Sequence, residues 1–409
     1  MSTRARAAVL TAGVLLAAPP AAAEGSFEPV VELRAYNNGN VNVLGPNEGD
    51  SALRLAVDLP WTVRRPLSTF RVLYRPYFEV YSSEDSSRDF GHALSAIYSR
   101  NLSRLSGFST AVRVRHSEQQ GLLLEDPDLP SSLVPRTPVF RAAADIRGRM
   151  AVGPRSYLDL GLGTDFIRYE DIPPTVYPDP AVPDLPGIDF VDSDLAELTL
   201  GWGMAFTPRL TAGLVAGYRY VAVEEGEDTT VATLAFDGRR DFERGLRASL
   251  RIGALQAKTG EFTSTEPALD LSLSRELSRN SSLSAGLRQA VSGGNGFTRA
   301  ASLDSGGWVN WDWWRLPSLH LSAGAGFWRR EAIEGLGAEK RGATRTVQTT
   351  ESASWMPGNR MEYGVFHTYR DQGGYQELLA EPGKGYHAVG LFLRWHVKGR
   401  RTGDGPGGA

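Results

Sequence analysis

Apolar and polar residues alternate along most of this chain, in segments that are unusually long. In residues 209–223, "RLTAGLVAGYRYVAV", Leu210, Leu214 and Tyr218 fall on one side of an extended backbone, and Arg219 falls on the other. The segments run for about 10 to 15 residues, whereas strands of soluble sheets usually have about 5 or 6. Strands of this length are typical of a tilted crossing of a bilayer. We predict about eighteen of them, within a range of about 16 to 20, at residues 28–37, 50–63, 68–82, 89–102, 107–118, 137–151, 155–169, 193–206, 209–223, 229–238, 243–256, 266–277, 281–291, 299–313, 317–330, 343–355, 360–370 and 385–397.

The connections between these segments alternate in length. Short ones such as "TPR" (207–209) and "PGN" (357–359) alternate with longer polar ones such as residues 119–136 and 257–265. Short turns on one rim and long loops on the other are typical of outer-membrane barrels, and a soluble sandwich has no reason to sort its loops in this way. A propeller is a weaker alternative because its strands are shorter. The predicted fold is all-β: a transmembrane antiparallel up-and-down β-barrel with a polar lumen and no plug domain.

The polar side of the segments carries many charges, and a dry core could hold them only at a cost of several kcal/mol per ion. A water-filled lumen removes this cost, so we predict that these residues line a pore. The arginines of neighbouring segments form a predicted basic sector of the wall: Arg71, Arg75, Arg113, Arg115, Arg141, Arg147 and Arg149. Other lumen charges are expected at Glu79, Asp145, Asp159, Asp165, Glu197, Arg219, Arg247 and Arg251.

Two interpretations of this basic sector stand. It guides an anionic solute or an acidic polymer through the pore, or it is a structural ladder whose arginines pair with acids such as Asp145, Asp159 and Glu79. The predicted lipid-facing side is almost free of charge, and Glu351 is the clearest exception. Aromatic residues near the short turns are expected to form an interfacial girdle, namely Trp61, Phe206, Trp311, Trp313, Trp355 and Trp395.

The N-terminus is typical of a secretory signal peptide at residues 1–23. Arg4 and Arg6 precede an apolar run, and the small residues 21–23 satisfy the cleavage rule. Removal of this peptide near Ala23 and Glu24 would leave a barrel at 24–397 and a flexible periplasmic tail at 398–409. No apolar run of about 18 residues follows, so no spanning helix is expected. We therefore expect the protein in the bacterial outer membrane, in contact with its lipid.

Composition and motifs exclude several classes of function. The chain has no cysteine, which rules out thiolate metal sites and cysteine nucleophiles, and its net charge of −3 argues against nucleic-acid binding. His320 and Ser322 share one face but lie beside a short turn, so no enzyme is expected. No catalytic residue, cofactor or metal site is predicted. The proline-rich, acidic segment 170–194 is expected to be an outer loop, with a constriction of the lumen as the alternative.

The N-terminal third resembles a known family. Residues 31–61 and 68–118 contain an Asn-rich segment, an acidic step into an apolar strand, and a "Y-x-P" strand with an aromatic run that begins at Tyr74 and Pro76. These features resemble the opening of the family named "putative β-barrel porin 2". The resemblance implies an outer-membrane barrel associated with exopolysaccharide production, acting with a periplasmic polysaccharide-export protein. It supplies no catalytic or binding residues.

Two functions are therefore expected for this barrel. The resemblance implies the exit channel of an exopolysaccharide or capsule export machine, with a polysaccharide as cargo. The alternative is a general or anion-preferring porin for small solutes. An outer-membrane enzyme and a scaffold barrel that holds a periplasmic partner are less favoured.

Overall fold

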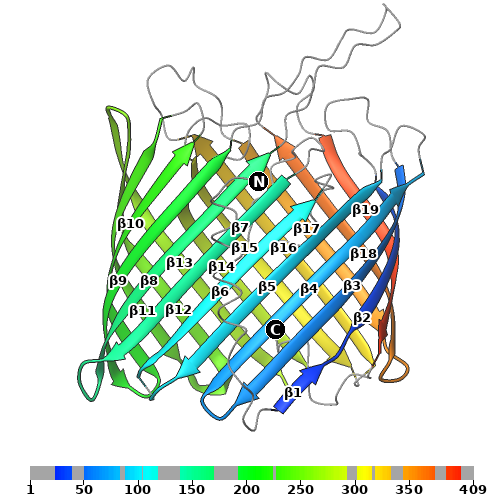
Figure 1. The fold of residues 1–409 in the computed structure, drawn as a ribbon, viewed down its shortest axis with the longest axis horizontal. Helices are drawn as coiled ribbons and strands as arrows, with labels where there is room; N and C mark the ends of the chain where they lie inside the picture. The colour runs from blue at the N-terminus through cyan, green and yellow to red at the C-terminus, as the bar shows by residue number, and fades with distance from the viewer. Residues whose placement is uncertain are drawn as a thin grey trace, which may run out of the picture.

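The strands of the computed structural model pair antiparallel from β2 to β19, and β19 pairs back onto β2, so the sheet closes on itself (Figure 1). The ring has eighteen strands, and the predicted transmembrane up-and-down barrel is confirmed. The strands are β1 Glu24–Phe27, β2 Val30–Asn38, β3 Asp50–Arg65, β4 Ser68–Tyr81, β5 Asp89–Asn101, β6 Gly107–Ser117, β7 Val139–Ala151, β8 Ser156–Tyr169, β9 Ser193–Thr207, β10 Leu210–Val223, β11 Thr229–Asp241, β12 Leu246–Thr259, β13 Phe262–Ser278, β14 Ser281–Ser292, β15 Ser302–Arg315, β16 Leu319–Ala332, β17 Thr344–Trp355, β18 Met361–Gly373 and β19 Lys384–His396, with a 3-10 turn, η1, at Glu243–Gly245.

The structure describes the strands and most of the short turns. The described residues are 24–38, 50–82, 88–103, 105–117, 139–169, 192–223, 227–292, 302–315, 318–332, 344–373 and 384–397. The predicted signal peptide, the predicted tail and most of the segment 170–194 lie outside these ranges, so their predicted roles stay predictions. Within the described ranges, no helix is long and apolar enough to cross a bilayer.

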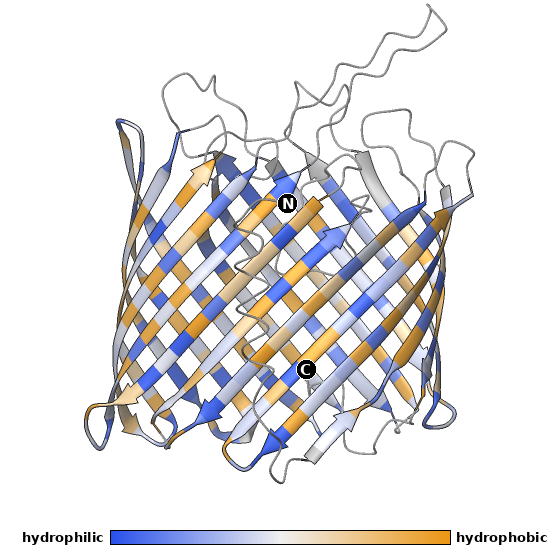
Figure 2. Cartoon of the chain, in the orientation of Figure 1, coloured by the Kyte–Doolittle hydropathy of each residue, from blue (hydrophilic) through white to orange (hydrophobic). Residues whose placement is uncertain are grey.

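The two faces of the wall differ in chemistry, and the pairing register keeps each face continuous around the ring. On β10, Leu214 is 53% exposed and lies between the outward residues Trp202 of β9 and Phe236 of β11. Arg219 of the same strand lies on the other face, opposite Glu197. Figure 2 shows the resulting alternation of apolar and hydrophilic residues along the strands. An apolar outside around a polar inside is the pattern of a membrane-spanning barrel.

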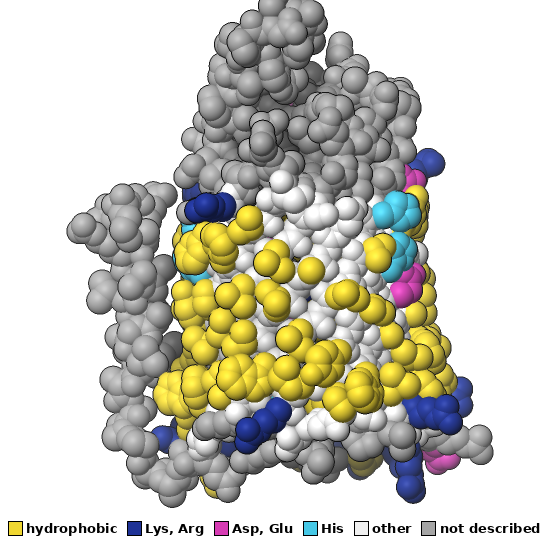
Figure 3. All heavy atoms as spheres, turned by 90° about the vertical axis from the view of Figure 1, so that its right-hand side faces the viewer, with side chains coloured by type: hydrophobic (Ala, Val, Ile, Leu, Met, Phe, Trp, Pro, Cys, Tyr) yellow, Lys and Arg dark blue, Asp and Glu magenta, His cyan; other side chains and the backbone are white. Residues whose placement is uncertain are grey.

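On the face of the barrel shown in Figure 3, apolar side chains form a belt, with basic side chains below it at one rim. The aromatic residues predicted as a girdle all lie on this outward face near the short turns: Trp61, Phe206, Trp311, Trp313, Trp355 and Trp395. The indole nitrogen of Trp311 also donates a hydrogen bond to Ser281 Oγ at 3.0 Å. Their contact with the membrane interface stays a prediction.

Glu351 is a polar exception on the outward face, and it has partners there. Its Oε2 lies 2.7 Å from Nδ1 of His367, and Nε2 of His367 lies 3.3 Å from Nδ1 of His387. Histidine and acidic side chains stand out within the apolar belt in Figure 3. Pairing with the imidazole lowers the cost of a carboxyl group in this position, because polar groups at membrane depth persist when they satisfy one another.

One short strand was not predicted, and one predicted loop was wrong. The strand expected at 28–37 is β2, but β1 precedes it and pairs with the lower part of β3. Pro29, which has no N–H to donate, lies between β1 and β2 and separates them. Residues 257–265 were expected as a long loop, but β12 and β13 continue into a tight hairpin there. Gly260 turns that hairpin with φ of 56°, a conformation that favours glycine.

Candidate functional site: the charged lumen and its narrowed mouth

The register places the charged residues that were predicted to line the lumen on the inward face. On β7, Ile146 and Met150 point outward with 53% and 60% exposure, and Arg141, Asp145 and Arg147 occupy the alternate positions. The same alternation puts the other members of the set on the inward faces of β4, β6, β8, β9, β10 and β12. The sequence-based set is therefore brought together on one continuous surface.

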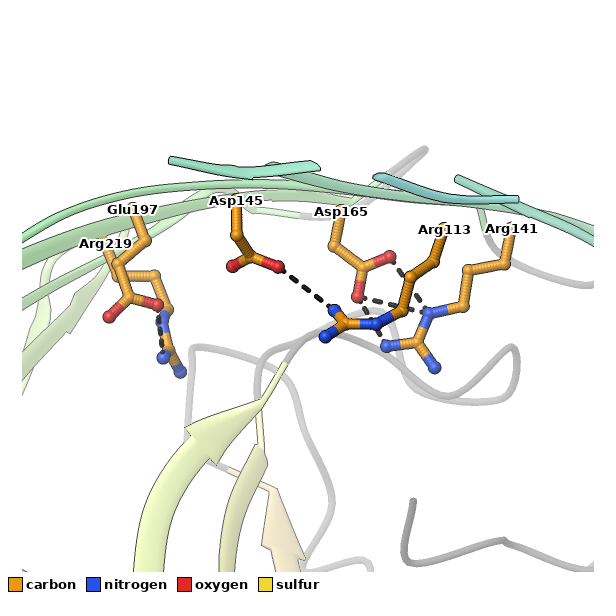
Figure 4. A network of polar contacts seen from close by, with 6 residues as sticks. All are labelled: Arg113, Arg141, Asp145, Asp165, Glu197 and Arg219. Carbon is orange, nitrogen blue, oxygen red and sulfur yellow. Dashed lines mark hydrogen bonds and ion pairs between the residues drawn. The ribbon is translucent and has the colours of Figure 1, made fainter. Parts of the chain in front are cut away.

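Much of the basic sector is paired with carboxylates on adjacent strands. Arg141 Nη2 lies 2.6 Å from Asp165 Oδ2, and its Nε donates a second hydrogen bond to the same carboxylate. Arg113 reaches Asp145 at 3.0 Å. Figure 4 shows these pairs in a row along the inside of the wall. A guanidinium that binds one carboxylate through two nitrogens is held in a defined orientation.

Other predicted lumen charges are paired in the same way. Arg149 and Asp159 form a two-nitrogen pair, with the shortest approach at 2.7 Å, and Arg75 pairs with Asp58. Arg251 Nε lies 3.2 Å from Asp237 Oδ1. For Arg247, at the short-turn end of β12, the described residues show no ion pair. Glu79 is 2% exposed and accepts a hydrogen bond from the hydroxyl of Tyr36, so this acid is part of a buried network rather than an open wall.

Three members of the basic sector remain outside the ladder. Arg71, Arg115 and Arg147 form no ion pair with any residue that the structure describes. They lie on β4, β6 and β7, the same strands that carry the paired arginines. Both interpretations of the sector therefore account for part of it: the ladder holds four of the seven arginines, and the other three leave positive charge on the wall.

The mouth of the pore is narrowed by a contact between the inward face of β10 and the end of β14. Arg219 on β10 pairs with Glu197 at 2.7 Å and also donates a hydrogen bond to the backbone carbonyl of Val291 on β14. Three strands, β11, β12 and β13, separate β10 from β14 along the wall. An arginine side chain is too short to follow that arc. The end of β14 therefore leans into the lumen.

The side chain of Val291 confirms this displacement. Val291 lies in the same row as Leu283 and Leu287, which point outward with 36% and 50% exposure, but it is only 3% exposed itself. The pairing of β13 with β14 stops at Gln289, which frees the rest of β14 to move inward. Val291 packs there on inward-facing residues of β11, β12 and β13: Val231, Leu255, Ala257 and Ala268.

We call residues 290–292 of β14 and 302–304 of β15 the inner end, since they line the lumen as a second layer. Asp304 of the inner end forms a two-nitrogen pair with Arg330 of β16, and both side chains are 12% exposed. The guanidinium of Arg330 is close enough to the hydroxyl of Tyr169 to interact with it electrostatically. Tyr169 lies on β8, across the ring from β16, so the charge of Arg330 acts on a group of the opposite wall.

The sequence-based reasoning missed a set of aromatic residues on the inward face. Each lies directly opposite a glycine of the neighbouring strand, and a Cβ at that glycine would meet the ring within 2.2 to 2.8 Å. The rings therefore lie flat over the glycines, an arrangement that protects a weak position in a strand. The alternation of faces along each strand could have placed the rings on the inward face. Their glycine partners could be identified only from the pairing register between strands. The pairs are Tyr77–Gly91, Tyr157–Gly203, Trp308–Gly286, Trp328–Gly306 and Phe392–Gly364.

The polar groups at the His320 position do not form a catalytic triad. Nε2 of His320 lies 3.2 Å from Asp312, whereas the hydroxyl of Ser322 shares a hydrogen bond with Ser352 at 2.7 Å. A nucleophile needs its base within hydrogen-bond reach, and the described contacts place the two groups with different partners. Among the described residues there is also no cluster of three or more His, Cys, Asp or Glu side chains that could hold a metal ion.

Comparisons with known proteins give similarity of fold at a low level. No family model matches the chain, and no curated protein matches it. OccK3 (OpdO) of Pseudomonas aeruginosa aligns with a TM-score of 0.42 and 13% identity, over 91% of this chain and 96% of its own. OpdL of the same organism aligns with a TM-score of 0.42 and 12% identity, over 91% of this chain and 99% of its own. The siderophore receptor PirA of Acinetobacter baumannii aligns with a TM-score of 0.43 and 7% identity, over 91% of this chain and 81% of its own. Such TM-scores carry no argument about function, and the resemblance to the β-barrel porin 2 family is not confirmed.

Proposed function

We propose that this protein is a passive channel of the bacterial outer membrane for small water-soluble solutes, with a preference for anions. The observation that carries the proposal is a closed barrel whose outside is apolar and whose inside is lined by charges, some paired in the ladder and some without an ion pair among the described residues. Charges arranged around a wet lumen are the usual basis of ion selectivity in a pore. The narrowed mouth favours small solutes over a wide polymer.

The preference for anions rests on Arg71, Arg115 and Arg147. Paired charges such as Arg141 and Asp165 largely cancel at a distance, whereas arginines outside the ladder keep their field in the lumen. Export of an exopolysaccharide rests on the resemblance of the N-terminal third alone. No contact among the described residues favours it, so it stays a prediction.

Single-channel recording in planar bilayers under a salt gradient tests this function. The purified full-length protein should open channels whose reversal potential indicates anion preference, and glutamine at the three arginine positions should shift it toward cations. A preparation that inserts as folded barrels but never conducts would contradict the channel.

The matched control removes charge without changing the net charge. In Arg141→Gln combined with Asp165→Asn, both partners of one ladder pair are neutral. We expect the reversal potential of this variant to stay close to that of the unmodified protein. An equal shift in the control and in the triple variant would show that the three arginines outside the ladder have no special role.

A further inference from the structure

The inward face of the hairpin β15–β16 carries a column of residues that the charged ladder does not explain. From the mouth inward, the Asp304–Arg330 pair is followed by the indole rings of Trp328 and Trp308, and then by Asn310. Trp328 lies over Gly306, and Trp308 lies over Gly286. Because each ring rests with one face on a backbone without a side chain, its other face is directed at the lumen.

The other three rings that lie over a glycine are each covered by an arginine side chain. The guanidinium of Arg149 lies 3.9 Å from the centroid of Tyr157, and that of Arg54 lies 4.2 Å from the centroid of Tyr77. Arg394 covers Phe392 at 4.5 Å. In those places the ring holds an arginine against the wall by a cation–π contact.

Trp308 and Trp328 differ from these three rings. Among the described residues, neither has a cation–π contact or a contact with another aromatic ring, and both are partly exposed. Two open indole faces along one strand pair form a surface on which a flat ring can stack.

The polar groups beside this surface, and the wall that faces it, narrow the class of ligand. Asn310 is exposed and offers both a donor and an acceptor, and the Asp304–Arg330 pair offers both as well. The charge of Arg330 acts on the hydroxyl of Tyr169 on the opposite wall, and β8, which carries Tyr169, pairs with β7 of the basic sector. The gap therefore has an aromatic wall with mixed hydrogen-bonding groups on one side and positive charge on the other.

We propose that Trp308 and Trp328 form a stacking platform for a saccharide ring that bears a carboxylate. The inference rests on the proposed channel and names its substrate class. A pyranose presents an apolar C–H face to an indole, while its hydroxyl groups both donate and accept hydrogen bonds. Its carboxylate is directed to Arg115, which lies outside the ladder two residues from the mouth end of β6. An aromatic acid matches the rings and the positive charge, but it leaves Asn310 and the Asp304 carboxylate without hydroxyl partners.

Block of the open-channel current by an added solute tests this platform. The probes are digalacturonate, maltose as a neutral saccharide with the same number of rings, and benzoate as an aromatic anion. Digalacturonate should block the unmodified channel at the lowest concentration. Trp308→Ala and Trp328→Ala should each weaken that block about fivefold, the loss expected for about 1 kcal/mol of aromatic contact. Trp308→Phe should retain most of it, because a ring remains.

The control is Trp202→Ala, which removes an outward indole that is 48% exposed and should leave the block unchanged. Block by digalacturonate that is the same in both lumen variants would overturn the platform, as would a benzoate block that is tighter and equally dependent on the two tryptophans. Channels that open normally but are not blocked by any saccharide would reject this inference and leave the channel intact. An absence of channels would reject the proposed function itself.

Discussion

At the scale of single residues, the meaning of a position depends on which face it occupies. Leu214 and Val215 are neighbours on β10, yet Leu214 is directed at lipid and Val215 at the lumen. The surroundings of a glycine also depend on the face that it occupies. Gly203 lies under the ring of Tyr157 on the inward face, whereas a Cβ at Gly148, on the outward face of β7, would have no atom within 4 Å. Substitutions at such pairs separate the effect of the environment from that of the strand.

Leu214→Arg should destabilise the barrel by about 2–4 kcal/mol, because a charge near the middle of the lipid-facing surface is poorly solvated. Val215→Arg, one position along the same strand, should cost far less, since its side chain enters the wet lumen. Reversible unfolding by guanidinium in lipid vesicles measures both free energies. Equal losses would show that the two faces of β10 have been assigned wrongly.

Gly203→Ala should lower the free energy of unfolding by about 1–3 kcal/mol, as expected for an overpacked site. The added Cβ would lie 2.4 Å from the ring of Tyr157, which must then leave its place under the guanidinium of Arg149. Gly148→Ala is the control, and it should be neutral within about 0.5 kcal/mol. The same unfolding assay compares the two, and similar losses would mean that the ring–glycine contact contributes nothing.

At the scale of elements, the inner end of β14 and β15 behaves differently from the rest of the wall. Its apolar side chains pack on the inward faces of β11 to β13, and Arg219 anchors its backbone from β10. Because one hydrogen bond to a charged group is worth about 1.5–3 kcal/mol, loss of Arg219 should release the inner end without unfolding the barrel.

The chain lacks cysteine, so a single introduced thiol reports this release without background. Val291→Cys should react slowly with a water-soluble maleimide, since Val291 is 3% exposed. Adding Arg219→Gln should make it react faster and should raise the single-channel conductance. Asn310→Cys, exposed on the lumen face, should react at the same rate in both backgrounds. Rapid labelling of Val291→Cys with Arg219 intact would contradict the inward position of this segment.

At the scale of the whole molecule, the closed ring of hydrogen bonds should survive mild detergent. A closed sheet has no free edge from which unfolding can begin. On a gel, the unheated protein should therefore run at a different apparent mass from the boiled protein. A mobility that does not depend on heating would count against a closed barrel.

Much of this architecture could be predicted from the sequence, because alternation of two unlike faces is a local property. The strand expected at 193–206 is Ser193–Thr207, and the one expected at 281–291 is Ser281–Ser292. The hairpin around Gly260 was missed because its strand ends are polar and rise beyond the apolar belt, where local composition resembles a loop. The inner end was missed for another reason: the burial of Val291 depends on four strands that come together only in the folded barrel.

The candidate site, too, could be predicted only in part from the sequence. The faces of Arg141 and Asp165 follow from counting along each strand, but their pairing follows from the register between strands. That register also decides which arginines remain outside the ladder and which rings lie over a glycine. The open faces of Trp308 and Trp328 could not be recognised from the chain alone.

The seam between β2 and β19 has a consequence for the order in which the barrel forms. β2 contributes only nine residues to it, and Glu32 and Arg394, which pair across it, are 362 positions apart in the chain. Every other junction of the eighteen-strand ring joins strands that are neighbours in sequence and can pair locally, whereas the seam must wait for its two distant strands to meet. Contacts between distant residues form slowly because their loop entropy is lost first. The seam should therefore be the last junction to close during folding and the first to exchange its amide hydrogens with solvent.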